Sequence, residues 1–223
     1  MRLIWSIFRT TFGVMRWKIA QRLELRWWKR YLRNRNLEEY LSWKKAYWQD
    51  FVAQLNLPKI EGRTLDAGCG PAGVFMILNE ADVTAIDPLL EKYENDLNLP
   101  SEEYKERITF KPLGIEDYFM IEHFDFIFCL NAINHVKDMS KALHNLGESL
   151  KPGGRMIVSI DCHNFKLFKG LFKILPFDIL HPHQFDLDEY QSQLMNEGIK
   201  VERSILIKNG FIFNYYALVG RRI

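Results

Sequence analysis

The chain has 223 residues, of which 48% are hydrophobic and 26% are charged, and its formal net charge is +2. This composition excludes a mainly disordered or low-complexity chain, because 16 Phe, 9 Tyr and 6 Trp can bury ample apolar surface. No apolar run reaches the roughly 18 residues of a membrane-spanning helix. Cys69, Cys129 and Cys162 are widely separated and make no disulfide framework, so we expect a reducing compartment, the cytoplasm.

The first 36 residues are strongly basic and rich in tryptophan. They contain ten Lys/Arg and a single acid, Glu24, and all six Trp lie within the first 48 residues. Apolar residues recur every three or four positions, which predicts a helix with one apolar stripe. The stripe consists of Trp5, Phe8, Phe12, Met15, Ile19 and Leu23. Such a helix suits an anionic membrane surface; the alternatives are packing on the protein's own body, contact with a second subunit, or a targeting peptide.

A second helical stretch is expected from Leu37 to Leu55, with Tyr40, Trp43, Lys44 and Tyr47 on an aromatic face. Pro58 and Gly62 then end the helical region. We expect residues 1–58 to form a basic helical extension or cap, and residues 59–223 to form the main domain.

From Arg63 onward, strand and helix patterns alternate. Strands are expected at 64–67, 83–86, 108–112, 124–130 and 155–160, and helices at 72–79, 89–97 and 137–150. A helix at 187–196 is followed by strands at 201–207 and 211–219, with the hairpin signal Asn209-Gly210 between them. These patterns predict an α/β fold: a doubly wound, mostly parallel seven-stranded sheet that ends in an antiparallel hairpin, with an N-terminal helical extension.

A glycine-rich turn follows the first strand in the string LDAGCGPAG at 65–73. Glycine lets the backbone turn sharply and approach a ligand closely, and open α/β sheets bind ligands at the carboxyl ends of their strands. The string also fits G-x-G-x-x-G, which alone indicates a dinucleotide fold only weakly. Asp66 would be poorly placed beside a pyrophosphate but well placed for a cationic ligand. Asp87 ends the second strand, where a carboxylate can accept both hydroxyls of a ribose.

These residues resemble class I S-adenosylmethionine-dependent methyltransferases over roughly residues 60–220. The matching strings are LDAGCGPAG at 65–73, VTAIDP at 83–88, FDFIFCLNAINHV at 124–136 and LKPGGRMIVSI at 150–160. The resemblance implies S-adenosylmethionine as cofactor, an antiparallel hairpin at the end of the sheet, and a cofactor site of known layout. The site it implies comprises Asp66, Gly68, Cys69, Gly70, Asp87, Pro88, Ile115, Glu116, Leu130 and Asn131.

In that layout Asp66 lies near the amino group of the cofactor, and Asp87 lies on its ribose. Ile115 and Glu116 lie by the adenine, and Leu130 and Asn131 line the pocket after the fourth strand. The sequence departs from the family where Gly114 replaces a frequent acid, so another group must bind the adenine amine. Glu116 could equally be a solvated residue, and the cysteines small buried ones.

The methyl acceptor is expected where the fourth and fifth strands end. His135 is the candidate base, because imidazole titrates near neutral pH; a helix-start His that only bonds backbone is the alternative. Tyr47, His181 and His183 are assigned to the acceptor pocket, the two histidines within an insertion at 161–186 that would form a lid. His-x-His is poor ligand spacing, so no metal is expected.

The apolar, basic segments 1–36 and 164–175 favour a small hydrophobic or membrane-associated acceptor, methylated at oxygen, and a peripheral membrane location. Nucleic acid is a less favoured partner, because the apolar stripe of the first helix is stronger than nucleic-acid contact requires. The oligomeric state stays open. The alternatives are a non-catalytic module that binds S-adenosylmethionine and an NAD-dependent oxidoreductase.

Overall fold

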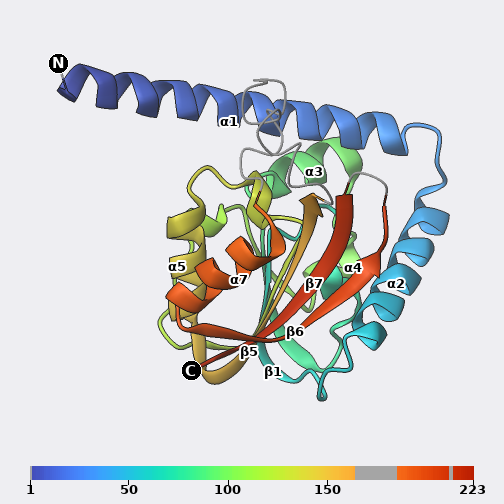
Figure 1. Cartoon of the computed structure of the whole chain (residues 1–223). Helices are drawn as coiled ribbons and strands as arrows, with labels where there is room; N and C mark the ends of the chain where they lie inside the picture. Colours follow the sequence, from blue (N-terminus) through green and yellow to red (C-terminus); the bar gives the residue numbers. More distant parts are fainter. Residues whose placement is uncertain (1, 164–184, 211–212) are drawn as a thin grey trace.

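Alternating strands and helices build one seven-stranded sheet in the computed structural model (Figure 1). The structure describes the backbone of residues 2–163, 185–210 and 213–223, and the side chains of these residues except 2–16 and 163. The strands are β1 (Gly62–Ala67), β2 (Ala81–Ile86), β3 (Thr109–Lys111), β4 (Phe124–Leu130), β5 (Leu150–His163), β6 (Ile199–Lys208) and β7 (Phe213–Arg222). Their order is β3-β2-β1-β4-β5-β7-β6, and β7 runs in the direction opposite to the other six strands. The predicted sheet with a terminal hairpin is confirmed.

The helices agree with the sequence patterns except that the short helix at 102–105 was not predicted and that the helix expected at 72–79 is missing. They are α1 (Arg2–Leu32), α2 (Leu37–Gln54), α3 (Leu90–Leu97), α4 (Glu102–Lys105), α5 (Met139–Ser149) and α7 (Leu187–Asn196). Short 3-10 turns are η1 (Val74–Ile77), η2 (Ile115–Asp117) and η3 (Ile133–His135). Asn36 begins α2 by accepting from the backbone N–H of Glu38 and Glu39.

The helix expected at 72–79 is wrong, because the segment forms only the 3-10 turn η1. Gly73 is extended, with ψ −175°, and so interrupts any helix that would continue from Pro71. Strand β2 already begins at Ala81, which leaves too few residues for a helix of ordinary length. The glycine turn is therefore followed by a single tight turn and not by a full helix.

Helices cover both faces of the sheet (Figure 1). One core joins α5 and α7 to the sheet through residues such as Leu146, Leu194 and Ile127. The other core lies on the opposite face and includes Phe51 of α2, Leu55 directly after it, and Phe128. Trp48 of α2 also donates from Nε1 to the carbonyl of Ala72, at 3.0 Å. The second helical stretch thus packs into the core of the sheet.

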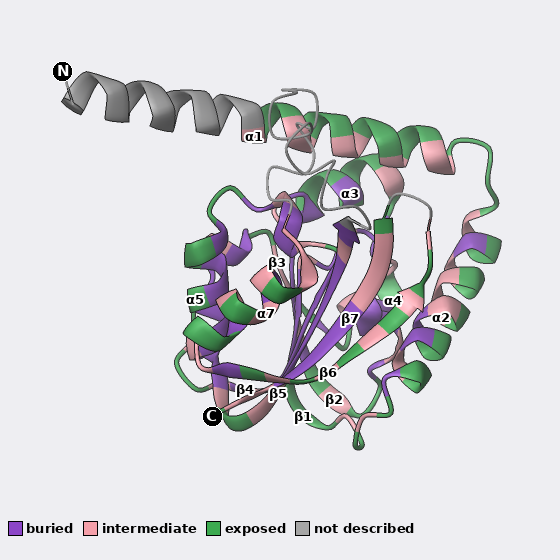
Figure 2. Ribbon diagram, viewed as in Figure 1, coloured by how far each residue is buried: buried purple, intermediate pink, exposed green. Residues whose placement is uncertain are grey.

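The C-terminal half of α1 lies over α3 (Figure 1). Lys29 pairs with Asp96 of α3 at 2.9 Å. The outward face of this half of α1 is exposed (Figure 2), and Ile19, Leu23 and Trp27 are 38%, 37% and 54% exposed on it. Ile19 and Leu23, the described end of the predicted apolar stripe, are therefore not buried against the body. Among the described residues, no helix combines the length and the apolarity that a membrane crossing requires.

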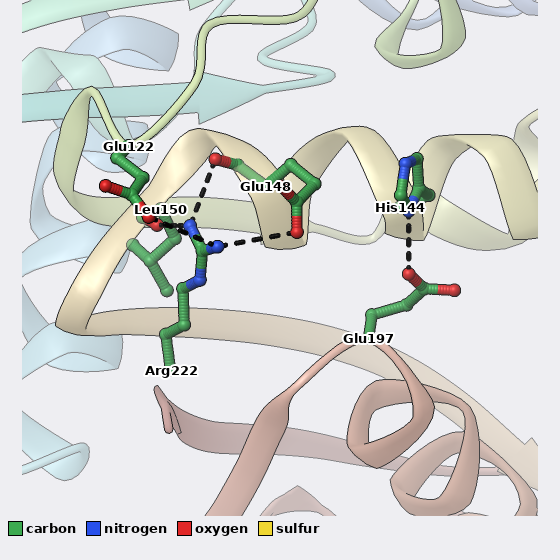
Figure 3. Close-up of polar contacts among 6 residues, drawn as sticks. All are labelled: Glu122, His144, Glu148, Leu150, Glu197 and Arg222. Carbon is green, nitrogen blue, oxygen red and sulfur yellow. Dashed lines mark hydrogen bonds and ion pairs between the residues drawn. The ribbon is translucent and has the colours of Figure 1, made fainter.

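The end of β7 is fastened to the junction of α5 and β5 by Arg222 (Figure 3). Its guanidinium donates to the carbonyls of Glu148 (3.1 Å) and Leu150, and pairs with the carboxylates of Glu148 (3.4 Å) and Glu122 (3.6 Å). These contacts tie the last strand of the hairpin to the α5–β5 junction and to the loop before β4.

Candidate cofactor and methyl-transfer site

The glycine turn bends back over the end of β2. The backbone N–H groups of Gly68 and Cys69 donate to the carbonyl of Ile86, at 2.8 and 3.0 Å. Gly68 and Gly70 have φ of +72° and +59°, a backbone conformation that favours glycine. A Cβ at Gly70 would meet no atom within 4 Å, so the backbone is open there to an approaching ligand.

Asp87 lies directly beside this open backbone. Its Oδ2 accepts from the N–H of Gly70 at 3.0 Å, and its Oδ1 accepts from Leu89 at 2.8 Å. Burial, followed by the charge of Glu24 on α1, raises the pKa of Asp87 to about 7. Pro88 follows and is half-buried. The structure thus brings together Gly70 and Asp87, which the sequence assigns to one site.

Asp66 is almost fully buried near the end of β1. Its Oδ2 accepts from the N–H of Phe75 at 3.0 Å, so the carboxyl group anchors η1. Burial raises its pKa to about 7, against the opposing effects of the N–H of Phe75 and the charge of Lys44. A Cβ at Gly73 would clash with this carboxylate, so Gly73 serves close packing.

Lys44 lies near Asp66, a pairing that the sequence did not reveal. The sequence places it only on the aromatic face of α2. Burial lowers the pKa of its ammonium to about 8, and the charge of Asp66 acts in the opposite direction. Its Nζ lies 4.4 Å from the ring centre of Trp48 and 4.7 Å from that of Tyr47. The sequence shows only a lysine among aromatic residues. It does not show that Asp66 is the acid near that lysine in space.

The residues expected by the adenine have different surroundings. The buried Ile115 lies next to Gly68, since a Cβ there would be 3.7 Å from its Cδ1. The carboxylate of Glu116 instead accepts from the backbone of Lys137 (2.7 Å) and Asp138 (3.2 Å). Asn145 holds η2 in place by donating to the carbonyls of both Ile115 and Glu116.

Cys69 and Leu130 are both buried, and burial raises the pKa of the Cys69 thiol well above its ordinary value. Both side chains are therefore uncharged, as expected of small or apolar buried residues.

A hydroxyl network lies at the ends of β4 and β5. Asn131 has φ of +54°, and its N–H donates to Ser159 Oγ at 2.9 Å. Ser159 Oγ lies 2.6 Å from Tyr215 Oη, and the hydroxyls of Tyr215 and Tyr47 are also hydrogen-bonded. Tyr47 and Asn131 thus meet through two residues, Ser159 and Tyr215, that the sequence did not single out.

His135 ends η3 and is half-buried, and its backbone N–H donates to the carbonyl of Ala132 at 3.0 Å. Its neighbour Asn134 is buried, with an amide oxygen that has no hydrogen-bond partner. The predicted acceptor residues His181 and His183, and the apolar segment 164–175, lie outside the described residues. No cluster suited to a metal ion appears among the residues that the structure describes.

Together, these groups suit S-adenosylmethionine. Asp87 can accept from the ribose hydroxyls, and the open backbone at Gly70 lets the ligand approach. The antiparallel β7 distinguishes the sheet from the all-parallel order of classic dinucleotide folds. The fold and the site define the chain as a class I S-adenosylmethionine-dependent methyltransferase.

A family model described as a methyltransferase domain matches residues 21–203, and the chain belongs to this family. Its fold is similar to that of YcgJ from Bacillus subtilis, with a TM-score of 0.65 and 16% identity over 79% of this chain and 98% of that one. A Burkholderia thailandensis 1,6-didemethyltoxoflavin-N1-methyltransferase, solved with S-adenosylhomocysteine, has a TM-score of 0.61 and 17% identity over 92% of this chain and 89% of that one.

Among curated proteins, the ubiquinone biosynthesis O-methyltransferase of Alkalilimnicola ehrlichii is 33% identical over 137 residues, which cover 59% of this chain and 53% of that protein. The chain spans about half to two thirds of the length of the curated relatives that it matches.

Proposed function

We propose that the protein transfers the methyl group of S-adenosylmethionine to a hydroxyl oxygen of a small, amphiphilic, quinone-like acceptor at a membrane surface. The observation that carries the cofactor part is the contact between Asp87 and the open backbone of Gly70. Oxygen as the acceptor atom is supported by the relatives, whose names describe O-methylation in ubiquinone biosynthesis.

In this proposal the ribose and the methionine part of the cofactor are held by different elements. Asp87 accepts the ribose hydroxyls, and Lys44 pairs with the carboxylate of the methionine part. Asp66, beside Lys44, faces the amino group. Ile115 and the backbone of η2 lie by the adenine. Leu130 and Asn131, with Cys69 and Pro88, complete the walls.

When bound, the cofactor supplies an electrophilic methyl group on a sulfonium. The protein has to hold the acceptor hydroxyl in line with that group, and proximity accounts for much of such a rate. His135 takes the hydroxyl proton as the O–CH₃ bond forms and the S–CH₃ bond breaks, which leaves S-adenosylhomocysteine. Tyr47 lines the acceptor side in this proposal, and the roles predicted from the sequence for His181 and His183 stay predictions.

The membrane part of the proposal is supported by the outward face of α1. Ile19, Leu23 and Trp27 lie four residues apart, so they form one exposed ridge. Arg22, Arg26, Lys29 and Arg30 flank it, and all are exposed. An apolar ridge beside a row of cations is a surface suited to anionic headgroups. We propose a cytoplasmic protein that is peripheral at the membrane.

Methyl transfer can be tested with the full chain, S-adenosylmethionine labelled in its methyl group, and vesicles containing a polyprenylated catechol. We expect label in the lipid phase as a methyl ether, and about a hundredfold slower transfer by His135→Gln with little change in cofactor affinity. A catechol already methylated at both hydroxyls is the control and should take up no label. Absence of transfer to the catechol, or label on nitrogen or carbon, would contradict the proposal.

A further inference from the structure

The basic helix α1 brings one carboxylate toward the cofactor site. Glu24 is the only acid among residues 1–36, which carry ten Lys/Arg. Its Oε1 accepts a hydrogen bond from the hydroxyl of Tyr93 at 3.0 Å, and the side chain of Trp28 also hydrogen-bonds to it. Two donors therefore hold the one acidic side chain on the inward face of this helix.

Tyr93 connects that contact to Asp87. It lies in the first turn of α3, three residues after Leu90, and its N–H bonds to the carbonyl of Leu89, whose own N–H is held by Asp87. The Tyr93 side chain is completely buried. Burial, and then the charges of Asp87 and Glu24, raise its pKa, so its hydroxyl lies near both carboxylates.

We propose that Glu24 is a positioning residue of the cofactor site: through Tyr93 it seats α1 against the start of α3, beside the carboxylate that receives the ribose. The inference rests on the cofactor role proposed above for Asp87. It makes α1 a wall of the site rather than only an appendage. It also links the helix with the exposed basic face to the affinity for the cofactor.

The charge of Glu24 gives this role a distinctive signature. Burial first, and the charge of Glu24 second, raise the pKa of Asp87. The other ionisable groups that face the pair are Tyr93 from α3, Asp66 from β1 and Cys69 from the glycine turn. Ribose hydroxyls favour the ionised carboxylate, because it accepts both of their hydrogen bonds. Burial also raises the pKa of Glu24, so the two carboxyl groups compete for protons as a pair. Removing Glu24 from this pair should therefore let Asp87 ionise, and bind ribose, at lower pH.

Calorimetric titration of the full chain with S-adenosylhomocysteine at about pH 6 and about pH 8 tests this. Glu24→Gln keeps an acceptor for Tyr93, so we expect affinity within about twofold of wild type at the higher pH and at least about threefold tighter binding at the lower one. Glu24→Ala also loses the contact, and should bind about tenfold more weakly at the higher pH. Lys29→Ala is the matched control, because Lys29 joins the same two helices through Asp96 without touching Glu24.

A purely structural Glu24 would lower the melting temperature of Glu24→Ala and leave the affinities of both variants equal to wild type at both pH values, which would overturn the inference. A Lys29→Ala variant that reproduces the pH shift of Glu24→Gln would also overturn it. Should Glu24→Ala not fold, the pH profile of Glu24→Gln alone decides. Failure of the wild type to bind S-adenosylhomocysteine would instead overturn the proposed function, and this inference with it.

Discussion

Asp66 and Asp87 are buried carboxyl groups at the ends of neighbouring strands, yet their partners differ. Asp66 bonds to the backbone of η1 and lies near Lys44, whereas Asp87 bonds to the backbone of Gly70 and Leu89. Asp66 therefore holds η1 in place and interacts with Lys44, while Asp87 lies beside the open backbone of Gly70.

The pH dependence of cofactor binding follows from these two groups. Burial raises the pKa of each to about 7, so each is protonated below that pH and ionised above it. Because the ribose and the cationic amino group both favour ionised carboxylates, affinity for S-adenosylhomocysteine should rise from about pH 6 to about pH 8. Above that pH it should fall again, because burial lowers the pKa of Lys44 to about 8 and the ammonium that pairs with the methionine carboxylate is then lost. Calorimetry across this range measures it; an affinity that falls between about pH 6 and about pH 8 would contradict the assignment.

Lys44→Met tests whether Lys44 binds the methionine part of the cofactor and not its adenosine part. The thioether fills a similar volume but cannot pair with a carboxylate, so affinity for S-adenosylhomocysteine should fall about tenfold or more. Adenosine lacks the methionine part, and its affinity should stay within about twofold of wild type. Equal losses for both ligands would show that Lys44 acts on the fold rather than on the methionine carboxylate.

At the residue scale, the sequence revealed the groups that lie next to one another along the chain. The glycine turn with Asp66, and Asp87 at a strand end, could be predicted from their spacing. Lys44, Ser159, Tyr215 and Glu24 could not, because each reaches the site only through packing between distant segments. Glu116 was predicted by the sequence to lie near the adenine, but its carboxylate is bonded to two backbone N–H groups, which the sequence did not indicate.

The terminal hairpin depends on a cluster around Arg222 that is separate from the glycine turn. Arg222→Met keeps the apolar stem but removes the donors for the Glu148 and Leu150 carbonyls and leaves nearby carboxylates without their cation. We expect the free energy of unfolding to fall by about 1–3 kcal/mol, with unchanged affinity for S-adenosylhomocysteine. Urea denaturation measures the first quantity, and an unaltered midpoint would contradict the role.

At the scale of elements, periodicity predicted strands and long helices well, because alternating and 3.6-residue patterns fix which face is buried. The helix at 72–79 failed where Gly73 extends the chain and β2 begins soon after. The apolar stripe of α1 correctly indicated a helix, but not which face meets the body. That face carries Glu24 and Trp28, whereas Ile19 and Leu23 of the predicted stripe are exposed.

The whole molecule combines a compact sheet domain with a basic helix laid across α3 (Figure 1). The outward ridge of that helix gives a prediction for membrane binding. The full chain should float with vesicles rich in anionic lipid, and the double variant Leu23→Glu with Trp27→Glu should lose most of this binding.

Ile121→Glu is the matched control for that flotation. Ile121 is 68% exposed but precedes β4, at the amino ends of the parallel strands. This variant should float like wild type. Binding that survives the double variant, or that is lost equally in the control, would argue against α1 as the membrane surface.

The central claim is that S-adenosylmethionine lies across the glycine turn with its ribose on Asp87. The most direct measurement is calorimetric titration of wild type and Asp87→Asn with S-adenosylhomocysteine, with NAD as the competing ligand. We predict binding to wild type, at least about a hundredfold loss in Asp87→Asn, and no heat with NAD. Equal affinities in wild type and Asp87→Asn, or preference for NAD, would contradict the account.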